Sequence, residues 1–170
     1  MKVVILAGGF GTRLSEYTRT IPKPMIKIGN IPIVVHIMHQ YLKYGFNDFI
    51  LATGYKSNYF KKFFRDFKKN KIPFNTILNG KKCNIIISDT GIKTLTGGRL
   101  KKVKKLLKDN ENFLFTYGDG LSSVNLKKLV NFHNSKNKLV TVTAVRPPAR
   151  FGEIKIRNNK VISFKEKPQV

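Results

Sequence analysis

The sequence predicts an α/β fold built on an open, mixed but mostly parallel sheet with helices on both faces. Short runs rich in β-branched and aromatic residues alternate with stretches whose apolar residues recur at helical spacing. Glycine-containing segments follow several of the predicted strands, and in such sheets ligands bind at the carboxyl ends of the strands.

The elements are expected in the following order. Residues 2–6 form a β-branched strand that opens into a glycine loop, after which a helix should follow. Further helices are predicted at residues 31–44, with Gly45 as the stop, at 57–70, with Ser57 as the cap, at 98–107 and at 126–133. Further strands are predicted at residues 48–53, 84–88, 113–116 and 139–145, and a hairpin at 152–156 and 161–164 across Asn158-Asn159.

Composition favours one globular domain over residues 1–170. Hydrophobic residues make up 41% of the chain, and 13 Phe with 6 Tyr supply bulky core side chains. The apolar run after Met1 is too short for a signal peptide or a membrane span, so we expect a cytoplasmic protein without a membrane partner. Cys83 is the single cysteine, which excludes an internal disulfide and argues against a structural zinc site.

The net charge of +24 by itself suggests a nucleic-acid or anionic-membrane partner. The cations are mostly Lys and are spread along the whole chain, whereas specific readers of nucleic acid use clustered Arg with exposed aromatic residues. A basic field alone gives only non-specific binding, so nucleic acid is not the expected partner. Anionic small molecules are therefore the expected ligands of this positively charged chain.

A glycine loop directly follows the first predicted strand, in the segment LAGGFGTRL. Its main-chain N–H groups can approach a phosphate closely, and Arg13 adds a fork of donors that suits a pyrophosphate group. The loop lacks the Lys-Ser/Thr ending of a Walker motif, and a glycine-rich turn without a ligand is the plain alternative. The segment PKPM follows, and its two prolines should hold the chain around Lys23 extended so that the ammonium faces the same pocket.

Three further segments carry residues suited to binding a metal ion, a nucleotide or a sugar phosphate. Asp119, in FTYGDG, can bind Mg²⁺, although an Asp-Gly pair also forms ordinary turns. The run Thr96-Gly97-Gly98 enters a helix and can present donors to a base or a phosphate, although helix capping would also explain it. Near the end of the chain, Glu166 suits sugar hydroxyls and Lys167 suits a phosphate, but both also fit an edge strand with alternating charges.

Together, LAGGFGTRL and PKPM resemble the signature of the sugar-1-phosphate nucleotidyltransferases. The segments DTG, TGGRLKKV, FLFTYGDG and PPARFGEI are similar to the glucose-1-phosphate cytidylyltransferase branch. The resemblance implies a Rossmann-like nucleotide-diphospho-sugar transferase fold. It also implies Mg²⁺-dependent formation of CDP-glucose and pyrophosphate from CTP and glucose 1-phosphate, as used in nucleotide-sugar and lipopolysaccharide O-antigen biosynthesis.

The resemblance also assigns residues. Arg13 should contact the β and γ phosphates, Lys23 the reacting phosphates, and Asp119 the metal. Gly152 and Glu166 should bind glucose hydroxyls, and Lys167 the sugar phosphate. The nucleotide site should comprise Leu6, Ala7, Gly8, Gly9, Gly11, Thr12, Arg13, Thr96, Gly97, Arg99 and Gly118.

Relatives of this kind continue for a substantial stretch beyond the EKP motif, so we expect this chain to be the N-terminal part of a longer catalytic domain. That further stretch supplies a second metal-binding Asp and subunit contacts in the family, which leaves open whether the chain is a homo-oligomer. Three alternatives therefore remain: a nucleotide- or sugar-phosphate-binding module without turnover, a relative that uses another nucleotide or sugar phosphate, and a basic nucleic-acid-binding protein.

Overall fold

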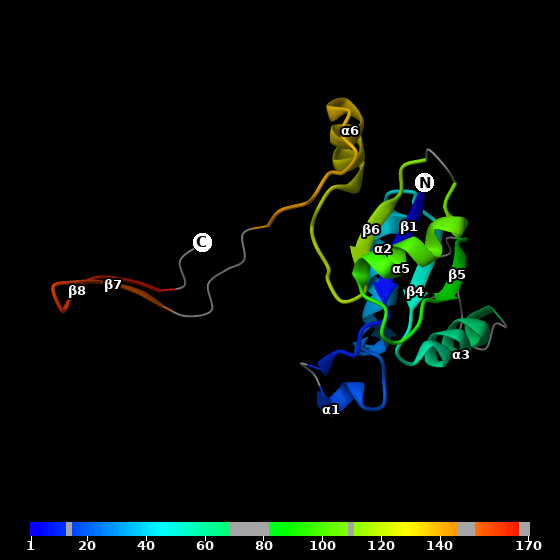
Figure 1. Cartoon of the computed structure of the whole chain (residues 1–170), viewed down its shortest axis with the longest axis horizontal. Helices are drawn as coiled ribbons and strands as arrows, with labels where there is room; N and C mark the ends of the chain where they lie inside the picture. Colours follow the sequence, from blue (N-terminus) through cyan, green and yellow to red (C-terminus); the bar gives the residue numbers. More distant parts are fainter. Residues whose placement is uncertain (13–14, 69–81, 109–110, 146–151, 167–170) are drawn as a thin grey trace. The chain divides into compact units, whose positions relative to one another are not determined.

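The computed structural model describes residues 1–12, 15–68, 82–108, 111–145 and 152–166 (Figure 1). Two compact units are present, Met1–Lys127 and Lys128–Val170. The first unit holds a four-stranded sheet with the order β5-β4-β1-β6, in which every pairing is parallel. Its strands are β1 (Lys2–Ala7), β4 (Asp48–Thr53), β5 (Asn84–Asp89) and β6 (Leu114–Tyr117). The predicted α/β class with a mostly parallel sheet is confirmed.

Helices connect these strands. They are α1 (Ser15–Thr18), α2 (Ile33–Lys43), α3 (Ser57–Lys68), α5 (Thr96–Val103) and the 3₁₀ helices η2 (Lys23–Met25) and η3 (Lys104–Leu106). The chain moves from β1 to β4 to β5 in one direction across the sheet and then returns to β6 on the other side of β1. Because such crossovers are right-handed, α2 and α3 cover one face of the sheet and α5 covers the other.

The core lies at the two central strands. Val3, Val4 and Ile5 are successive residues of β1, and all three are fully buried. Successive side chains of a strand point to opposite faces, so the sheet is covered on both sides. One face packs Val4, Leu6, Ile50 and Ala52 against Val103 of α5, with Leu100, Leu106 and Leu107 beside it.

Most element boundaries differ from prediction by one to three residues. The helix predicted at 31–44 begins at Ile33, because Ile31–Pro32 forms β3 and pairs antiparallel with β2 (Lys27–Ile28). The helix predicted at 98–107 begins at Thr96 and ends in η3. Residues 69 and 70 of the predicted third helix lie outside the described residues.

The second unit contains most of α6 (Leu126–Lys136) and the hairpin of β7 (Glu153–Arg157) and β8 (Lys160–Lys165). The hairpin turns at Asn158 and Asn159, whose φ angles of 49° and 59° confirm the predicted turn. The strand predicted at 139–145 is wrong, because these residues form no regular structure. Leu139 is 99% exposed and Val142 is 81% exposed, so this β-prone segment has no partner strand among the described residues.

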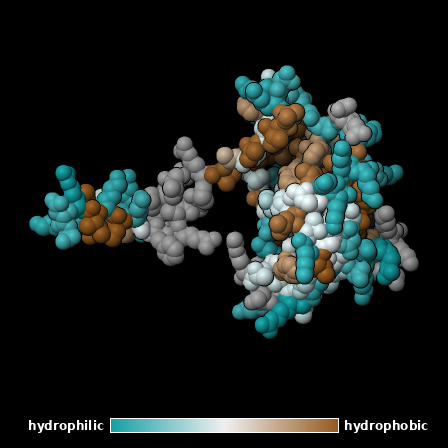
Figure 2. Space-filling model, viewed as in Figure 1, coloured by the Kyte–Doolittle hydropathy of each residue, from teal (hydrophilic) through white to brown (hydrophobic). Residues whose placement is uncertain are grey.

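The space-filling view shows brown hydrophobic residues among teal hydrophilic ones (Figure 2). No helix in the described ranges combines the length and the apolar character that crossing a bilayer would require.

Replacing Phe49 with Ala should destabilise the protein by about 3–5 kcal/mol, because this side chain of β4 is 1% exposed and its removal leaves a cavity in the core. Phe115→Ala on β6 is the matched control, since that side chain is 39% exposed. Chemical denaturation measures both changes. An equal loss in the two variants would contradict the location of the core at β1 and β4.

Candidate active site

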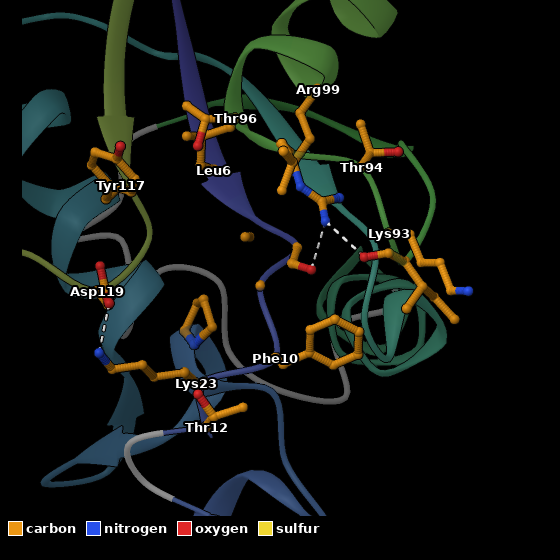
Figure 3. Close-up of a pocket in the computed structure, with 17 residues that line it drawn as sticks. Leu6, Phe10, Thr12, Lys23, Lys93, Thr94, Thr96, Arg99, Tyr117 and Asp119 are labelled. Carbon is orange, nitrogen blue, oxygen red and sulfur yellow. Dashed lines mark hydrogen bonds and ion pairs between the residues drawn. The ribbon is translucent and has the colours of Figure 1, made fainter.

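The carboxyl ends of β1, β5 and β6 border a cavity of about 400 Å³ (Figure 3). This rim of the sheet is where the chain reverses its direction across the sheet, the position at which α/β folds bind ligands. The loop after β1, the loop before α5 and the loop after β6 supply its walls. The lining residues are Leu6, Ala7, Gly8, Gly9, Phe10, Gly11, Thr12, Lys23, Pro24, Ile92, Lys93, Thr94, Leu95, Thr96, Arg99, Tyr117 and Asp119.

The glycines of the first loop obey different constraints. A Cβ on Gly8 would lie 2.1 Å from Nη1 of Arg99, so packing requires glycine there. Gly11 has a φ of +67°, a conformation that favours glycine. A Cβ on Gly9 would meet nothing within 4 Å. Neither a packing contact nor a positive φ therefore requires a glycine at position 9, and the main chain there is open to a ligand.

Lys23 and Asp119 meet at one wall of the cavity. Nζ of Lys23 donates to Oδ2 of Asp119 at 2.6 Å, and the two side chains are 29% and 35% exposed. Figure 3 draws this ion pair on the side of the cavity opposite Lys93. The two residues are 96 positions apart in the sequence, so the predicted convergence of Lys23 and Asp119 on one cleft is observed.

The main chain at Lys23 differs from the prediction. Pro22 is extended, with φ −64° and ψ 140°, but Lys23 begins the 3₁₀ helix η2. Pro24 is accommodated in this first helical turn because an N–H group there would lack a helical partner in any case. The turn is closed by the N–H of Met25, which donates to the carbonyl of Pro22 at 2.7 Å.

Gly118 sets the position of Asp119. Its N–H donates to the carbonyl of Leu6 at 2.8 Å, which ties the end of β6 to β1. A Cβ on Gly118 would lie 2.7 Å from that carbonyl and 3.0 Å from Cγ of Pro24. Glycine therefore lets the loop after β6 lie close to Pro24, the residue after Lys23. Gly118 itself does not line the cavity.

Arg99 of α5 lies at the floor of the cavity and is 5% exposed. Its two terminal nitrogens donate to the carbonyls of Gly8 at 2.8 Å, Thr53 at 2.9 Å and Gly91 at 2.9 Å. Burial lowers the pKa of Arg99, and the charge of Asp89 acts in the opposite direction. The guanidinium is thus held mainly by carbonyl oxygen atoms of the main chain at the ends of the parallel strands.

The other predicted residues divide into three groups. Leu6, Ala7, Thr12 and Thr96 line the cavity, whereas Gly97 does not, although a Cβ there would also meet nothing within 4 Å. Arg13 and Lys167 lie outside the described residues. The remaining two, Gly152 and Glu166, belong to the second unit.

Within the second unit, Gly152 and Glu166 are close neighbours beside the β7–β8 hairpin. A Cβ on Gly152 would lie 3.3 Å from Oε2 of Glu166 and 2.5 Å from the ring of Phe164. The hairpin register, which pairs Glu153 with Lys165, accounts for this proximity. The hairpin thus brings Gly152 beside the carboxylate of Glu166, and their predicted contact with glucose hydroxyls stays a prediction.

Sequence reasoning missed part of the cavity wall. The segment from Ile92 to Leu95 lines it, as do Phe10 and Tyr117. Phe10 packs against Tyr55 with a ring-centroid distance of 5.3 Å. The signal that could have identified residues 92–95 was their place between the DTG and TGG segments, at the exit of a predicted strand.

Within the described ranges, no three His, Cys, Asp or Glu side chains are grouped so that they could hold a metal ion without further ligands. Oδ2 of Asp119 nevertheless already holds a cationic group, the ammonium of Lys23. One carboxylate suits Mg²⁺ that keeps several waters and shares the phosphates of a bound nucleotide.

Comparison with known proteins points to one family. A model of the family described as nucleotidyl transferase matches residues 2–170. The glucose-1-phosphate cytidylyltransferase of Salmonella typhimurium is 45% identical to the chain over 179 residues, covering 99% of this chain and 70% of that protein. The probable glucose-1-phosphate cytidylyltransferase of Bacillus subtilis is 40% identical over 176 residues, covering 98% of this chain and 69% of that protein.

Solved structures show the same fold. HddC from Yersinia pseudotuberculosis complexed with GMP-PN matches with a TM-score of 0.66 and 28% identity, over 99% of this chain and 70% of that one. A UDP-glucose pyrophosphorylase complexed with UDP-glucose matches with a TM-score of 0.64 and 21% identity, over 99% of this chain and 69% of that one. The second likeness supports the fold alone.

Gly9→Ala should leave the stability unchanged and weaken triphosphate binding by about tenfold, because the methyl group enters open space that the ligand needs. Gly8→Ala should instead lower the stability by about 1–3 kcal/mol, since its Cβ collides with Arg99. Thermal unfolding and titration calorimetry separate the two effects. Full affinity in folded Gly9→Ala would contradict the placement of the ligand on this loop.

Proposed function

Because this chain belongs to the nucleotidyl transferase family, and is thus a nucleotidyltransferase, we propose that it transfers a cytidylyl group from CTP to glucose 1-phosphate. The products are CDP-glucose and pyrophosphate. The observation that carries the proposal is the meeting of the glycine loop, Lys23 and Asp119 around one cavity. The choice of CTP and glucose 1-phosphate rests on the 45% identity to a glucose-1-phosphate cytidylyltransferase.

The reaction is an in-line displacement at the α-phosphorus of CTP. A phosphate oxygen of glucose 1-phosphate forms the new P–O bond, and the bond to the β-phosphate oxygen breaks as pyrophosphate leaves. The attacking phosphate is already ionised at neutral pH, so no protein nucleophile is needed. The protein must hold two polyanions in line and offset their repulsion.

The residues of the chain divide this work. Main-chain N–H groups of the loop from Gly8 to Thr12 can donate to the triphosphate, and Lys23 adds a point charge beside it. Arg13 is proposed to bind the β and γ phosphates, and Lys167 the sugar phosphate. Gly152 and Glu166 are proposed to bind glucose hydroxyls, for which a carboxylate is a good acceptor.

Asp119 would hold Mg²⁺ together with the nucleotide. When bound, the ion supplies positive charge to the phosphate oxygens during displacement. Nζ of Lys23 lies 2.6 Å from Oδ2 of Asp119, so this ammonium competes with a metal ion for the carboxylate. We infer that the nucleotide draws Lys23 onto its phosphates and so releases Asp119, which makes nucleotide binding and metal binding mutually favourable.

A pyrophosphate-release assay across four nucleoside triphosphates and several sugar phosphates tests the reaction. CTP with glucose 1-phosphate should give the highest kcat/KM. Lys23→Ala and Asp119→Asn should each lower turnover by about 100-fold or more. The first removes a cation beside the reacting phosphates, and the second removes the carboxylate charge that would hold Mg²⁺. Lys61→Ala and Glu111→Gln are charge-matched controls on exposed positions away from the cavity.

Three outcomes would contradict the proposal. Calorimetric CTP binding without pyrophosphate release from any sugar phosphate would indicate a binding module. Preference for another nucleotide or sugar phosphate would indicate a different transferase. Duplex DNA binding with a steep salt dependence and no CTP affinity would indicate a nucleic-acid-binding protein.

The ion pair gives a prediction that does not depend on turnover. In the absence of nucleotide, Lys23→Met should bind Mn²⁺, a spectroscopic substitute for Mg²⁺, about three- to tenfold more tightly than the parent protein, because Asp119 loses its competing ammonium. Water-proton relaxation measures this affinity. Lys93→Met removes the same charge from the same cavity without touching Asp119, so an equal gain there would show a general field effect instead.

A further inference from the structure

Arg99 joins the ends of three parallel strands. Nη2 donates to the carbonyl of Gly8 at 2.8 Å, just after β1. Nη1 donates to the carbonyl of Thr53 at 2.9 Å, at the end of β4. The same nitrogen donates to Oγ1 of Thr90 at 2.6 Å and to the carbonyl of Gly91 at 2.9 Å, both just after β5. One side chain therefore fixes three loop exits relative to one another.

Two glycines make room for this guanidinium. A Cβ on Gly8 would lie 2.1 Å from Nη1, and a Cβ on Gly54 would lie 2.4 Å from the same atom. Contacts that short do not occur between real atoms, so any side chain at either position would displace the arginine. Gly8 and Gly54 thus serve the arginine by packing, independently of any ligand.

The bond to Gly8 has a directional consequence. The carbonyl of Gly8 and the N–H of Gly9 belong to one planar trans peptide, in which the two groups point in opposite directions. Nη2 of Arg99 donates to this carbonyl, and Figure 3 draws the bond as a dashed line from the guanidinium. Holding the carbonyl toward Arg99 therefore turns the N–H of Gly9 away from the arginine.

We propose that Arg99 is a positioning residue for phosphate binding: it fixes the Gly8–Gly9 peptide so that the loop donors face a triphosphate, without contacting the base itself. This rests on the proposed function, since it takes the triphosphate as the ligand of the loop. The planar fork of Arg99 spans Gly8, Thr53 and Gly91 together, which a lysine ammonium at a single point cannot do.

The test uses inorganic tripolyphosphate, which has phosphates but no base. Arg99→Lys keeps the charge and removes the fork, and it should weaken tripolyphosphate and CTP by similar factors of about tenfold or more in calorimetry. Lys102→Met is the matched control. That side chain also comes from α5 and binds the carbonyl of Thr90 at 2.8 Å, but it does not touch Gly8. It should change neither affinity by more than about twofold.

Two results would overturn the proposal. Unchanged tripolyphosphate affinity with weakened CTP would show that Arg99 reads the base directly. Equal losses in Arg99→Lys and Lys102→Met would show a general loosening of α5. A wild-type protein that binds tripolyphosphate but transfers no nucleotide would contradict the proposed function. The effect of Arg99→Lys on tripolyphosphate affinity could still be measured in that case.

A second variant covers the case in which Arg99→Lys does not fold. Arg99→Ala opens a space bordered by Gly8 and Gly54 that suits a guanidinium ion. Millimolar guanidinium should restore tripolyphosphate binding to this variant, whereas methylammonium at equal concentration should not, because it lacks the planar fork. Failure of guanidinium to restore binding in folded Arg99→Ala would also overturn the proposal.

Discussion

The parallel pairing of β1 with β4 on one side and β6 on the other is the constraint on which the site depends. The register places Ala7 beside Thr53 and Leu6 beside Tyr117, so these strands end at one rim of the sheet. Since the interior of β1 is buried on both faces, this pairing cannot slip without exposing the core. The loops that follow the strands therefore lie at the same rim of the sheet, together with the carbonyl groups at the strand ends.

Those carbonyl groups explain how a very basic chain organises its charges at the cavity. Arg99 is buried against oxygen atoms of the main chain, so its charge holds the ends of the strands together. Lys23 is paired with Asp119 at the wall of the cavity, beside the proposed phosphate site. The many surface lysines contribute attraction at a distance instead, which the net charge of +24 already implies.

The sequence predicted the order and type of most elements because their periodicity is local. It could not predict the fate of residues 139–145, since a β-prone run becomes a strand only beside a partner, and Leu139 is 99% exposed. The loop glycines, Lys23 and Asp119 were predicted as one site from their motifs. The ion pair between the last two, and the bonds of Arg99 to the carbonyls of Thr53 and Gly8, join segments 46 to 96 positions apart and follow only from the folded chain.

The glycines show most clearly what folding adds to a motif. In the letters of LAGGFGTRL, Gly8, Gly9 and Gly11 are equivalent, and each could equally serve a turn, a contact or a ligand. The structure separates them, because Arg99 accounts for Gly8 and a positive φ accounts for Gly11. Gly9 has neither a close neighbour nor an unusual conformation. A side chain at that position would be excluded by a molecule that occupies the cavity, so the remaining reason for glycine there is the approach of a ligand.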